Sequence, residues 1–333
     1  MSSVINVILS GGVGSRLWPL SRKSQPKQYL PIFEGETLFQ KTFKRNESFC
    51  DKVMVVGNCD NYELSRKDLE SAGKKDYVEI IEACPRNTAA AIAFAAFASQ
   101  SDDILFVTPS DHLIESGQKY QDSVDRAIQL AVDGHIVTFG LKPTKPETGF
   151  GYIKAEGEEV RGFREKPNLE TAEGFLKSGN FFWNSGMFCF QAGVYLEELK
   201  SFEPGVYNAA KAAFDSSVDG KLDIDLSMKI PSISVDYAVM EKTKKIKVVQ
   251  SKFSWSDMGS FESIYSYFRQ QGHAVDSKGN MVIGTSLHTE FLGMKNTLLV
   301  HTNDAILVLK KEKAQDVKKV FERLEREKPE ILA

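Results

Sequence analysis

Residues 4–16 read VINVILSGGVGSR, and this stretch indicates the fold class. Its first half is almost entirely apolar and β-branched, which is typical of a strand covered on both faces in a parallel sheet. Glycines at 11, 12 and 14 follow at once, and glycine lets backbone N–H groups come close to a phosphate. The stretch predicts a buried strand that ends in an anion-binding loop. A tight turn with nearby surface cations is the alternative.

Short apolar runs and helical patterns alternate along the rest of the first half. This alternation predicts βαβ units around a mainly parallel sheet. Residues 88–99 are nearly all Ala, Ile and Phe, so we expect a helix buried all round, with Asn87 as its N-cap. The expected strands are 4–9, 52–56, 77–81, 104–107 and 136–139, and the expected helices are 37–48, 61–72, 88–99 and 119–132.

The second half has a looser pattern and a distinct tail. Residues 151–154, 160–163 and 188–190 are expected strands mixed with loops. Beyond Asn280 we expect close-set strands at 281–283, 297–300 and 305–309, then a charged helix over 313–327. A chain of 333 residues exceeds the size at which one core usually stops growing. We therefore expect a large domain over 1–272 and a small β-rich C-terminal domain with a closing helix over 273–333.

Composition argues against a nucleic-acid or membrane protein. Lys and Arg number 42 against 45 Asp and Glu, so no strongly basic surface is expected. No window approaches the ~20 apolar residues needed to cross a bilayer. The four cysteines form no CxxC pair, which favours reduced, mostly buried thiols and a cytoplasmic protein.

The glycine loop matches neither common phosphate-binding motif. Leu17 stands where a dinucleotide-binding fingerprint needs glycine, and no Gly-Lys-Ser/Thr follows as in a Walker A loop. Arg16 lies inside the loop and Lys27 follows it. Two cations near a nest of backbone N–H groups suit a triphosphate.

Two aspartates far apart in the sequence are candidate metal ligands. Asp111 directly follows the fourth expected strand, and Asp257 lies in WSDMGSF at 255–261. Magnesium takes one or two carboxylates together with substrate phosphates and water. A helix cap or turn role is the alternative for each aspartate.

Several motifs together resemble the mannose-1-phosphate guanylyltransferase family, within the sugar-1-phosphate nucleotidyltransferases. They are LSGGVGSRLWPLSR at 9–22, PKQYL at 26–30, PRNTAAAIA at 85–93, FVTPSDHLI at 106–114, ETGFGYI at 147–153, FREKP at 163–167, NSGMFCF at 184–190 and WSDMGSF at 255–261. The resemblance implies a Rossmann-like α/β fold with a mixed, mainly parallel sheet flanked by helices. A small C-terminal β-rich appendage and a terminal helix would complete this nucleotide-diphospho-sugar transferase fold.

The resemblance also implies roles for particular residues. Arg16, Lys27 and Lys166 would act on the phosphates during catalysis, and Asp111 and Asp257 would bind Mg²⁺. The implied nucleotide-binding residues are Gly11, Gly12, Gly14, Ser15, Asn87, Thr88 and Ser110, and the implied sugar-phosphate-binding residues are Gly149, Glu165, Lys166, Asn184 and Asp236. Taken alone, Glu165 with Lys166 would be an exposed ion pair and Asn184 a turn residue.

The implied reaction joins GMP from GTP to α-D-mannose 1-phosphate, giving GDP-mannose and pyrophosphate. A related transferase with another nucleotide or hexose, and a non-catalytic nucleotide-sugar-binding subunit, are the alternatives. We expect a homodimer, or a larger assembly, that uses the region after Asn280. Phe261 stands where the family often has Trp, and we expect only a packing adjustment there. We expect no phosphomannose isomerase activity, because His288 and His301 are the only imidazoles after Gly284 and the tail is short.

Overall fold

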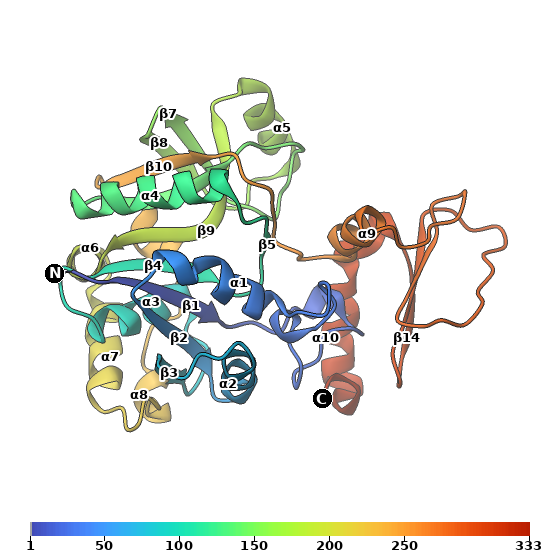
Figure 1. Ribbon diagram of the computed structural model, residues 1–333, viewed down its shortest axis with the longest axis horizontal. Helices are drawn as coiled ribbons and strands as arrows, with labels where there is room; N and C mark the ends of the chain where they lie inside the picture. The colour runs from blue at the N-terminus through green and yellow to red at the C-terminus, as the bar shows by residue number, and fades with distance from the viewer. Residues whose placement is uncertain (1) are drawn as a thin grey trace. The chain divides into compact units, whose positions relative to one another are not determined.

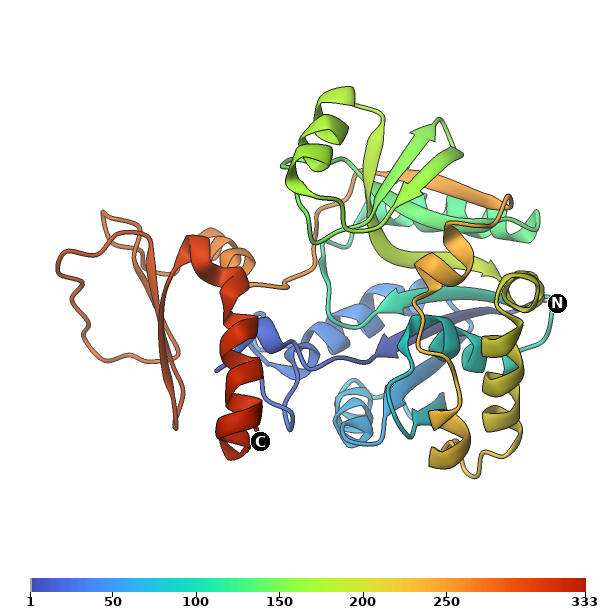
Figure 2. The same ribbon diagram turned by 180° about the vertical axis from the view of Figure 1, so that it is seen from behind.

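The computed structural model describes residues 2–333, and their contacts divide the chain into two compact units (Figures 1 and 2). The first unit comprises the residues up to Gly11 together with 42–110 and 114–255. The second unit comprises 12–41, 111–113 and 256–333. Short strands β5 (Leu113–Ile114) and β11 (Trp255–Ser256) stand at two of the points where the chain changes unit.

A nine-stranded mixed sheet forms the centre of the first unit, in the order β3-β2-β1-β4-β9-β6-β10-β8-β7. The strands β3, β2, β1 and β4 are parallel, as are β6 and β10, whereas β9 runs antiparallel between β4 and β6. The strands are β1 (Val4–Ser10), β2 (Lys52–Asn58), β3 (Val78–Glu82), β4 (Ile104–Pro109), β6 (Ile136–Leu141), β7 (Tyr152–Glu156), β8 (Glu159–Arg164), β9 (Phe181–Gln191) and β10 (Ile246–Ser251).

Helices cover both faces of this sheet. On one face, buried residues of β1 and β4 pack with α3 (Asn87–Phe97), α6 (Ala192–Phe202) and α7 (Pro204–Asp215). On the other face, Phe106 and Phe139 pack with buried residues of α4 (Gln118–Val132). Figure 1 shows α4 running along the sheet. The unit also contains α2 (Tyr62–Ser71), α5 (Leu169–Ser178), α8 (Ile224–Met228), a 3₁₀ turn at Glu47–Phe49 and a single π-helical turn at Asp236–Met240.

The second unit has its own core and a three-stranded sheet, visible from orange to red in Figure 2. β13 (Thr297–His301) pairs with β12 (Met281–Ile283) in parallel and with β14 (Ile306–Lys310) in antiparallel. Leu298 and Val300 of β13 are buried with Phe261 of α9 (Phe261–Gln270) and Phe321 of α10 (Val317–Glu327). Short 3₁₀ turns lie at Ser15–Leu17, Lys27–Tyr29, Lys311–Asp316 and Pro329–Leu332, and α1 (Leu38–Asn46) spans the change of unit after Lys41.

The predicted fold class is confirmed, and the strands and helices expected up to residue 139 form within about two residues of their predicted bounds. Between 169 and 270 the structure also forms α5, α6, α7, α8, α9 and β10, for which the sequence analysis made no prediction. The expected strand at 188–190 is part of the longer β9, whose polar centre around Asn184 interrupts the apolar run.

Asn87 differs from its predicted role as a helix cap. Arg86 precedes α3, and Asn87 is the first helical residue, with a left-handed φ of 67°. Its Oδ1 accepts a hydrogen bond of 2.9 Å from the N–H of Thr88. Asn tolerates this conformation better than most residues because its short side chain can bond to nearby backbone.

The four cysteines are free thiols, but only Cys189 is buried, and Cys59 is exposed. Within residues 2–333, no helix combines the length and apolar character needed to span a membrane.

Candidate active site

The glycine loop of the second unit packs closely on Lys27. Gly12 and Gly14 have left-handed φ values of 88° and 71°. A Cβ on Gly14 would lie 2.6 Å from the Cβ of Lys27, so a side chain at this position would displace the lysine. The Gly14 carbonyl accepts hydrogen bonds from the Leu17 N–H and the Ser21 hydroxyl, which fixes the turn that carries Ser15 and Arg16.

Lys27 brings together residues from three distant parts of the sequence. Its side chain is only 6 % exposed, and its Nζ lies 2.7 Å from Oδ2 of Asp111. The same Nζ donates a hydrogen bond of 2.6 Å to the backbone carbonyl of Asp257. The structure therefore places both candidate metal-binding aspartates beside one buried ammonium group.

The two aspartates have different surroundings. Burial opposes ionisation of Asp111, but the charges of Lys27 and His112 outweigh it and hold the pKa of Asp111 below its ordinary value. The carboxylate of Asp257 has no hydrogen-bond or ion-pair partner among residues 2–333. Gly259 makes room for it, since a Cβ there would lie 2.3 Å from Oδ2 of Asp257.

This donor set fits a magnesium ion. Two carboxylates and substrate phosphates are a usual Mg²⁺ environment, whereas structural zinc sites use four Cys or His ligands. Among residues 2–333, no three His, Cys, Asp or Glu side chains gather into a closed metal cage. A hard cation that shares its coordination with substrate oxygens suits Asp111 and Asp257.

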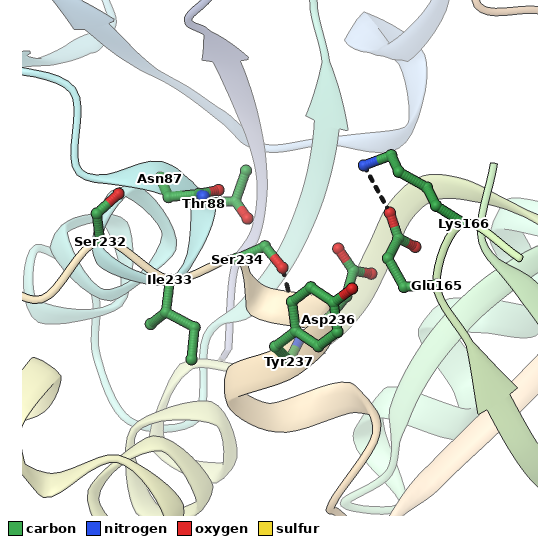
Figure 3. Close-up of a pocket in the computed structure, with 9 residues that line it drawn as sticks. All are labelled: Asn87, Thr88, Glu165, Lys166, Ser232, Ile233, Ser234, Asp236 and Tyr237. Carbon is green, nitrogen blue, oxygen red and sulfur yellow. Dashed lines mark hydrogen bonds and ion pairs between the residues drawn. The ribbon is translucent and has the colours of Figure 1, made fainter. Parts of the chain in front are cut away.

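The first unit contains a pocket of about 480 Å³, shown in Figure 3. Three segments form its walls: the start of α3, the end of β8, and the stretch that leads into the turn at Asp236–Met240. The pocket joins two predicted nucleotide-binding residues to three predicted sugar-binding residues. Its lining is Asn87, Thr88, Glu165, Lys166, Ser232, Ile233, Ser234, Asp236 and Tyr237.

Glu165 is fixed at the pocket wall by close packing. Its side chain is 10 % exposed, and Oε1 pairs with Nζ of Lys166 at 2.8 Å. A Cβ on Gly151 would lie 2.5 Å from Oε2 of Glu165, so glycine at 151 makes room for the carboxylate. Lys166 has a left-handed φ of 42°, and its side chain is 61 % exposed. Its ammonium group can therefore reach an anionic ligand.

Asn184 and Asp236 form a hydrogen-bonded pair beside the pocket. Nδ2 of Asn184 donates to Oδ1 of Asp236 at 2.9 Å, while Oδ1 of Asn184 accepts from the Thr138 hydroxyl at 3.1 Å. Burial and the nearby negative charge of Glu165 raise the pKa of Asp236 to about 6. Near neutral pH this carboxylate is ionised, and it can accept hydrogen bonds from hydroxyl groups.

Thr88 ties the start of α3 to the segment before Asp236. Its hydroxyl oxygen accepts the N–H of Val235 at 2.9 Å, and the Ala89 N–H donates to the Ile233 carbonyl at 3.3 Å. This segment supplies Ser232, Ile233 and Ser234 to the lining, and Tyr237 follows Asp236; the sequence analysis singled out none of these four residues. Their nearness to Asp236 in sequence was the one available signal.

Besides Asn184, three predicted residues of the first unit lie outside the pocket lining. Gly149 is in an exposed loop, where its N–H donates to Oε1 of Glu147 at 3.1 Å. Gly11 follows β1, and Ser110 follows β4, the strand paired with β1. The Ser110 hydroxyl is buried without a hydrogen-bond partner among residues 2–333.

A sequence profile described as "Nucleotidyl transferase" matches residues 5–273. The chain belongs to the nucleotidyl transferase family. A second profile, "MannoseP isomerase/GMP-like beta-helix domain", matches residues 273–324. "Mannose-1-phosphate guanylyltransferase 2" of Escherichia coli O157:H7 is 39 % identical over 96 % of this chain and 73 % of its own. These matches confirm the resemblance found in the sequence, and the chain is an enzyme, a nucleotidyltransferase.

Solved structures agree with this membership. A structure described as a "mannose-1-phosphate geranyltransferase", from Thermus thermophilus, superposes with a TM-score of 0.82 at 28 % identity, covering 97 % of this chain and 99 % of its own. Another, described as "mannose-6-phosphate isomerase from Helicobacter pylori", is 38 % identical with a TM-score of 0.70, covering 76 % of this chain and 99 % of its own. The nucleotidyltransferase and its structural relatives share the mixed α/β fold.

Proposed function

We propose that this nucleotidyltransferase transfers GMP from GTP to α-D-mannose 1-phosphate, giving GDP-mannose and pyrophosphate. The proposal rests on one observation. The same pocket of the first unit is lined by Asn87 and Thr88 and by Glu165, Lys166 and Asp236. These are the residues that the family resemblance assigns to a nucleotide and to a sugar phosphate. The names of relatives near 39 % identity support the choice of mannose 1-phosphate and guanylyl transfer.

The proposed reaction needs no protein nucleophile. A phosphate oxygen of mannose 1-phosphate attacks the α-phosphorus of GTP, a new P–O bond forms, and the bond to the bridging oxygen of pyrophosphate breaks. The attacking oxygen is already anionic, so no general base is required. The barrier arises from bringing two polyanions together in line, which cations and fixed position can lower.

In the first unit, we assign the sugar phosphate to the pocket residues and their neighbours. Glu165, Asn184 and Asp236 offer carboxylate and amide groups for sugar hydroxyls, and the exposed Lys166 ammonium group binds the phosphate. Asn87 and Thr88 lie at the nucleoside. We keep Gly149 as a sugar contact, which would require a ligand to reach its exposed loop.

In the second unit, we assign the triphosphate to the glycine loop and its cations. Gly12, Gly14 and Ser15 offer backbone N–H groups, and Arg16 and Lys27 neutralise the charge that develops on pyrophosphate. Gly11 and Ser110, at the ends of their strands in the first unit, remain proposed nucleotide-binding residues. Asp111 and Asp257 hold Mg²⁺, which supplies charge neutralisation on phosphate oxygens when bound.

The decisive assay measures pyrophosphate release with GTP, Mg²⁺ and a panel of sugar 1-phosphates, and then with UTP, dTTP, CTP and ATP. We expect mannose 1-phosphate with GTP to give the highest kcat/KM by at least about tenfold, since a base site that hydrogen-bonds guanine leaves polar groups unpaired with other bases. A higher kcat/KM for another pair of nucleotide and sugar 1-phosphate would favour the alternative of a related transferase with a different nucleotide or hexose.

The same preparation should be assayed for interconversion of fructose 6-phosphate and mannose 6-phosphate. This reaction is named for the Helicobacter pylori structure, and it differs in chemistry from nucleotidyl transfer. We also propose domains over 1–272 and 273–333, which the two profile matches meeting at residue 273 support. A homodimer and a cytoplasmic location complete the proposal.

A further inference from the structure

We propose that Lys27 competes with the metal for Asp111, so that the divalent cation binds strongly only after phosphates have drawn the lysine away. The inference rests on the proposed metal site and extends it. It assigns Lys27 a second role, beyond contact with the phosphates, as the group that controls metal affinity. All the residues involved belong to the second unit.

The contact with Asp111 is the first ground. The Lys27 ammonium lies 2.7 Å from Oδ2 of Asp111, one of the two oxygens that could ligate a cation. Its hydrogen bond to the Asp257 carbonyl holds it close to the second proposed ligand. A divalent ion on Asp111 would have to share this carboxylate with the ammonium group and would be repelled by its charge.

The confinement of Lys27 is the second ground. The side chain is 6 % exposed, and its Cβ packs under the glycine loop, where Gly14 has no room for a side chain. An exposed lysine could swing into water at little cost. A buried one leaves its carboxylate only when another anion receives it, and the phosphates proposed for the adjacent loop are such anions.

The unpaired carboxylate of Asp257 is the third ground. It is partly buried, it makes no hydrogen bond or ion pair with residues 2–333, and it lies close over Gly259. Lys27 bonds only to the backbone carbonyl of this residue. One proposed ligand therefore stays available for a cation while the other is held by Lys27, which is the arrangement expected of a site controlled by competition.

The consequence is coupling between metal and phosphate binding. Phosphates that take up the Lys27 ammonium free Asp111, and by linkage a bound metal favours the lysine position that contacts phosphates. A charge within 4–6 Å of a carboxylate changes its affinity for a proton by about 10- to 1000-fold. The same electrostatic repulsion should change the affinity of Asp111 for a divalent cation by at least about tenfold.

The test measures binding of Mn²⁺ alone, without nucleotide, from the electron paramagnetic resonance signal of the free ion. Lys27→Met should bind Mn²⁺ at least about tenfold more tightly than wild type. Lys23→Met removes an equal charge from an exposed residue of the same unit and should give no gain. Adding Asp257→Asn to Lys27→Met should abolish the gain, which would locate the ion at this site.

Equal or weaker Mn²⁺ binding by Lys27→Met, or no detectable binding by either protein, would overturn the inference. If the Met variant fails to fold, Lys27→Gln replaces it. Pyrophosphate release by wild type tests the proposed function separately, whatever the metal affinities are.

Discussion

Asn184 donates a hydrogen bond of 2.9 Å to Asp236, which lies 52 residues later in the sequence. Thr138 and the N–H of Gly186 both donate to the other end of the amide, at 3.1 Å each, so the amide is held with its NH₂ group toward Asp236. This pair joins the middle strand β9 to the π-helical turn at Asp236–Met240. It sets both the position and the acidity of a carboxylate in the proposed sugar site.

The first prediction concerns pH. Burial and Glu165 raise the pKa of Asp236 to about 6, while the Asn184 hydrogen bond lowers it. Below this pH the carboxyl group is protonated and accepts hydrogen bonds poorly, so KM for mannose 1-phosphate should rise as pH falls through about 6. Asn184→Ala should raise the pKa of Asp236 further and move the inflection to higher pH. The substrate titrates identically in both KM–pH profiles, so a difference between wild type and Asn184→Ala reports on the protein. Inflections at the same pH in the two proteins would contradict the prediction.

The second prediction uses a matched pair of glycines. Gly151→Ala should displace Glu165, because the new Cβ would lie 2.5 Å from its Oε2. We expect KM for mannose 1-phosphate to rise by about tenfold, equivalent to about 1.4 kcal/mol, with little change in KM for GTP. In Gly162→Ala the nearest atom would be 3.9 Å away, an ordinary contact, and kinetics should stay near wild type. Equal changes in KM from both substitutions would show that Glu165 does not contribute to the sugar site.

The third prediction concerns Asp257. Asp257→Asn changes volume little but removes a charged metal ligand, and Mg²⁺ prefers carboxylate oxygen. Turnover measured by pyrophosphate release should fall by at least about 100-fold, since charge stabilisation by a metal is worth several kcal/mol. The thermal melt should be unchanged. Asp102→Asn makes the same change of charge at an exposed position and should leave turnover unchanged. Wild-type turnover in Asp257→Asn would place the metal elsewhere.

The fourth prediction concerns stability and pH. Burial raises the pKa of Glu82 from 4.5 to about 8, so the folded protein holds this proton more tightly than the unfolded chain. The resulting stability is fully present below pH 4.5 and is lost as pH rises toward 8. Between pH 5 and pH 7.5 the loss is of the order of 3 kcal/mol.

Glu82→Gln should remove this loss, because the amide stays neutral at every pH. Urea midpoints measured from about pH 5 to about pH 8 should diverge, with the variant increasingly more stable than wild type. Glu173→Gln, an exposed change of the same kind, should follow wild type. Parallel curves for Glu82→Gln and wild type would show that the carboxyl group titrates normally.

The fifth prediction is a homodimer that uses the region after Asn280. β14 is an edge strand of its three-stranded sheet, and Ile306 and Val308 are 61 % and 51 % exposed on it. Edge strands with apolar side chains favour pairing between chains. Light scattering should show a dimer at micromolar concentration, and Ile306→Lys with Val308→Lys should give a monomer. Val218→Lys, at an exposed apolar position of the first unit, should leave the dimer intact. A monomeric wild type would contradict the prediction.

The parallel half of the sheet was predictable because its signals are local. β1, β2, β3 and β4 are short apolar runs, and each is followed by a segment with helical periodicity. The full length of the antiparallel strand β9 was not predictable, because the polar residues around Asn184 look like a loop until their partners are known. Thr138 and Asp236 satisfy those polar groups, and both are at least 46 residues away.

Periodicity and motif order are properties of the chain, and they were enough to predict the fold class, the family resemblance and the candidate site residues. The burial of Lys27 against Asp111 and the Asp257 carbonyl became known from the folded structure alone. The folded structure also showed that Ser232, Ser234 and Tyr237 line the pocket with Asp236. These facts depend on contacts between residues far apart in the chain, and on the desolvation those contacts impose, which no local pattern encodes.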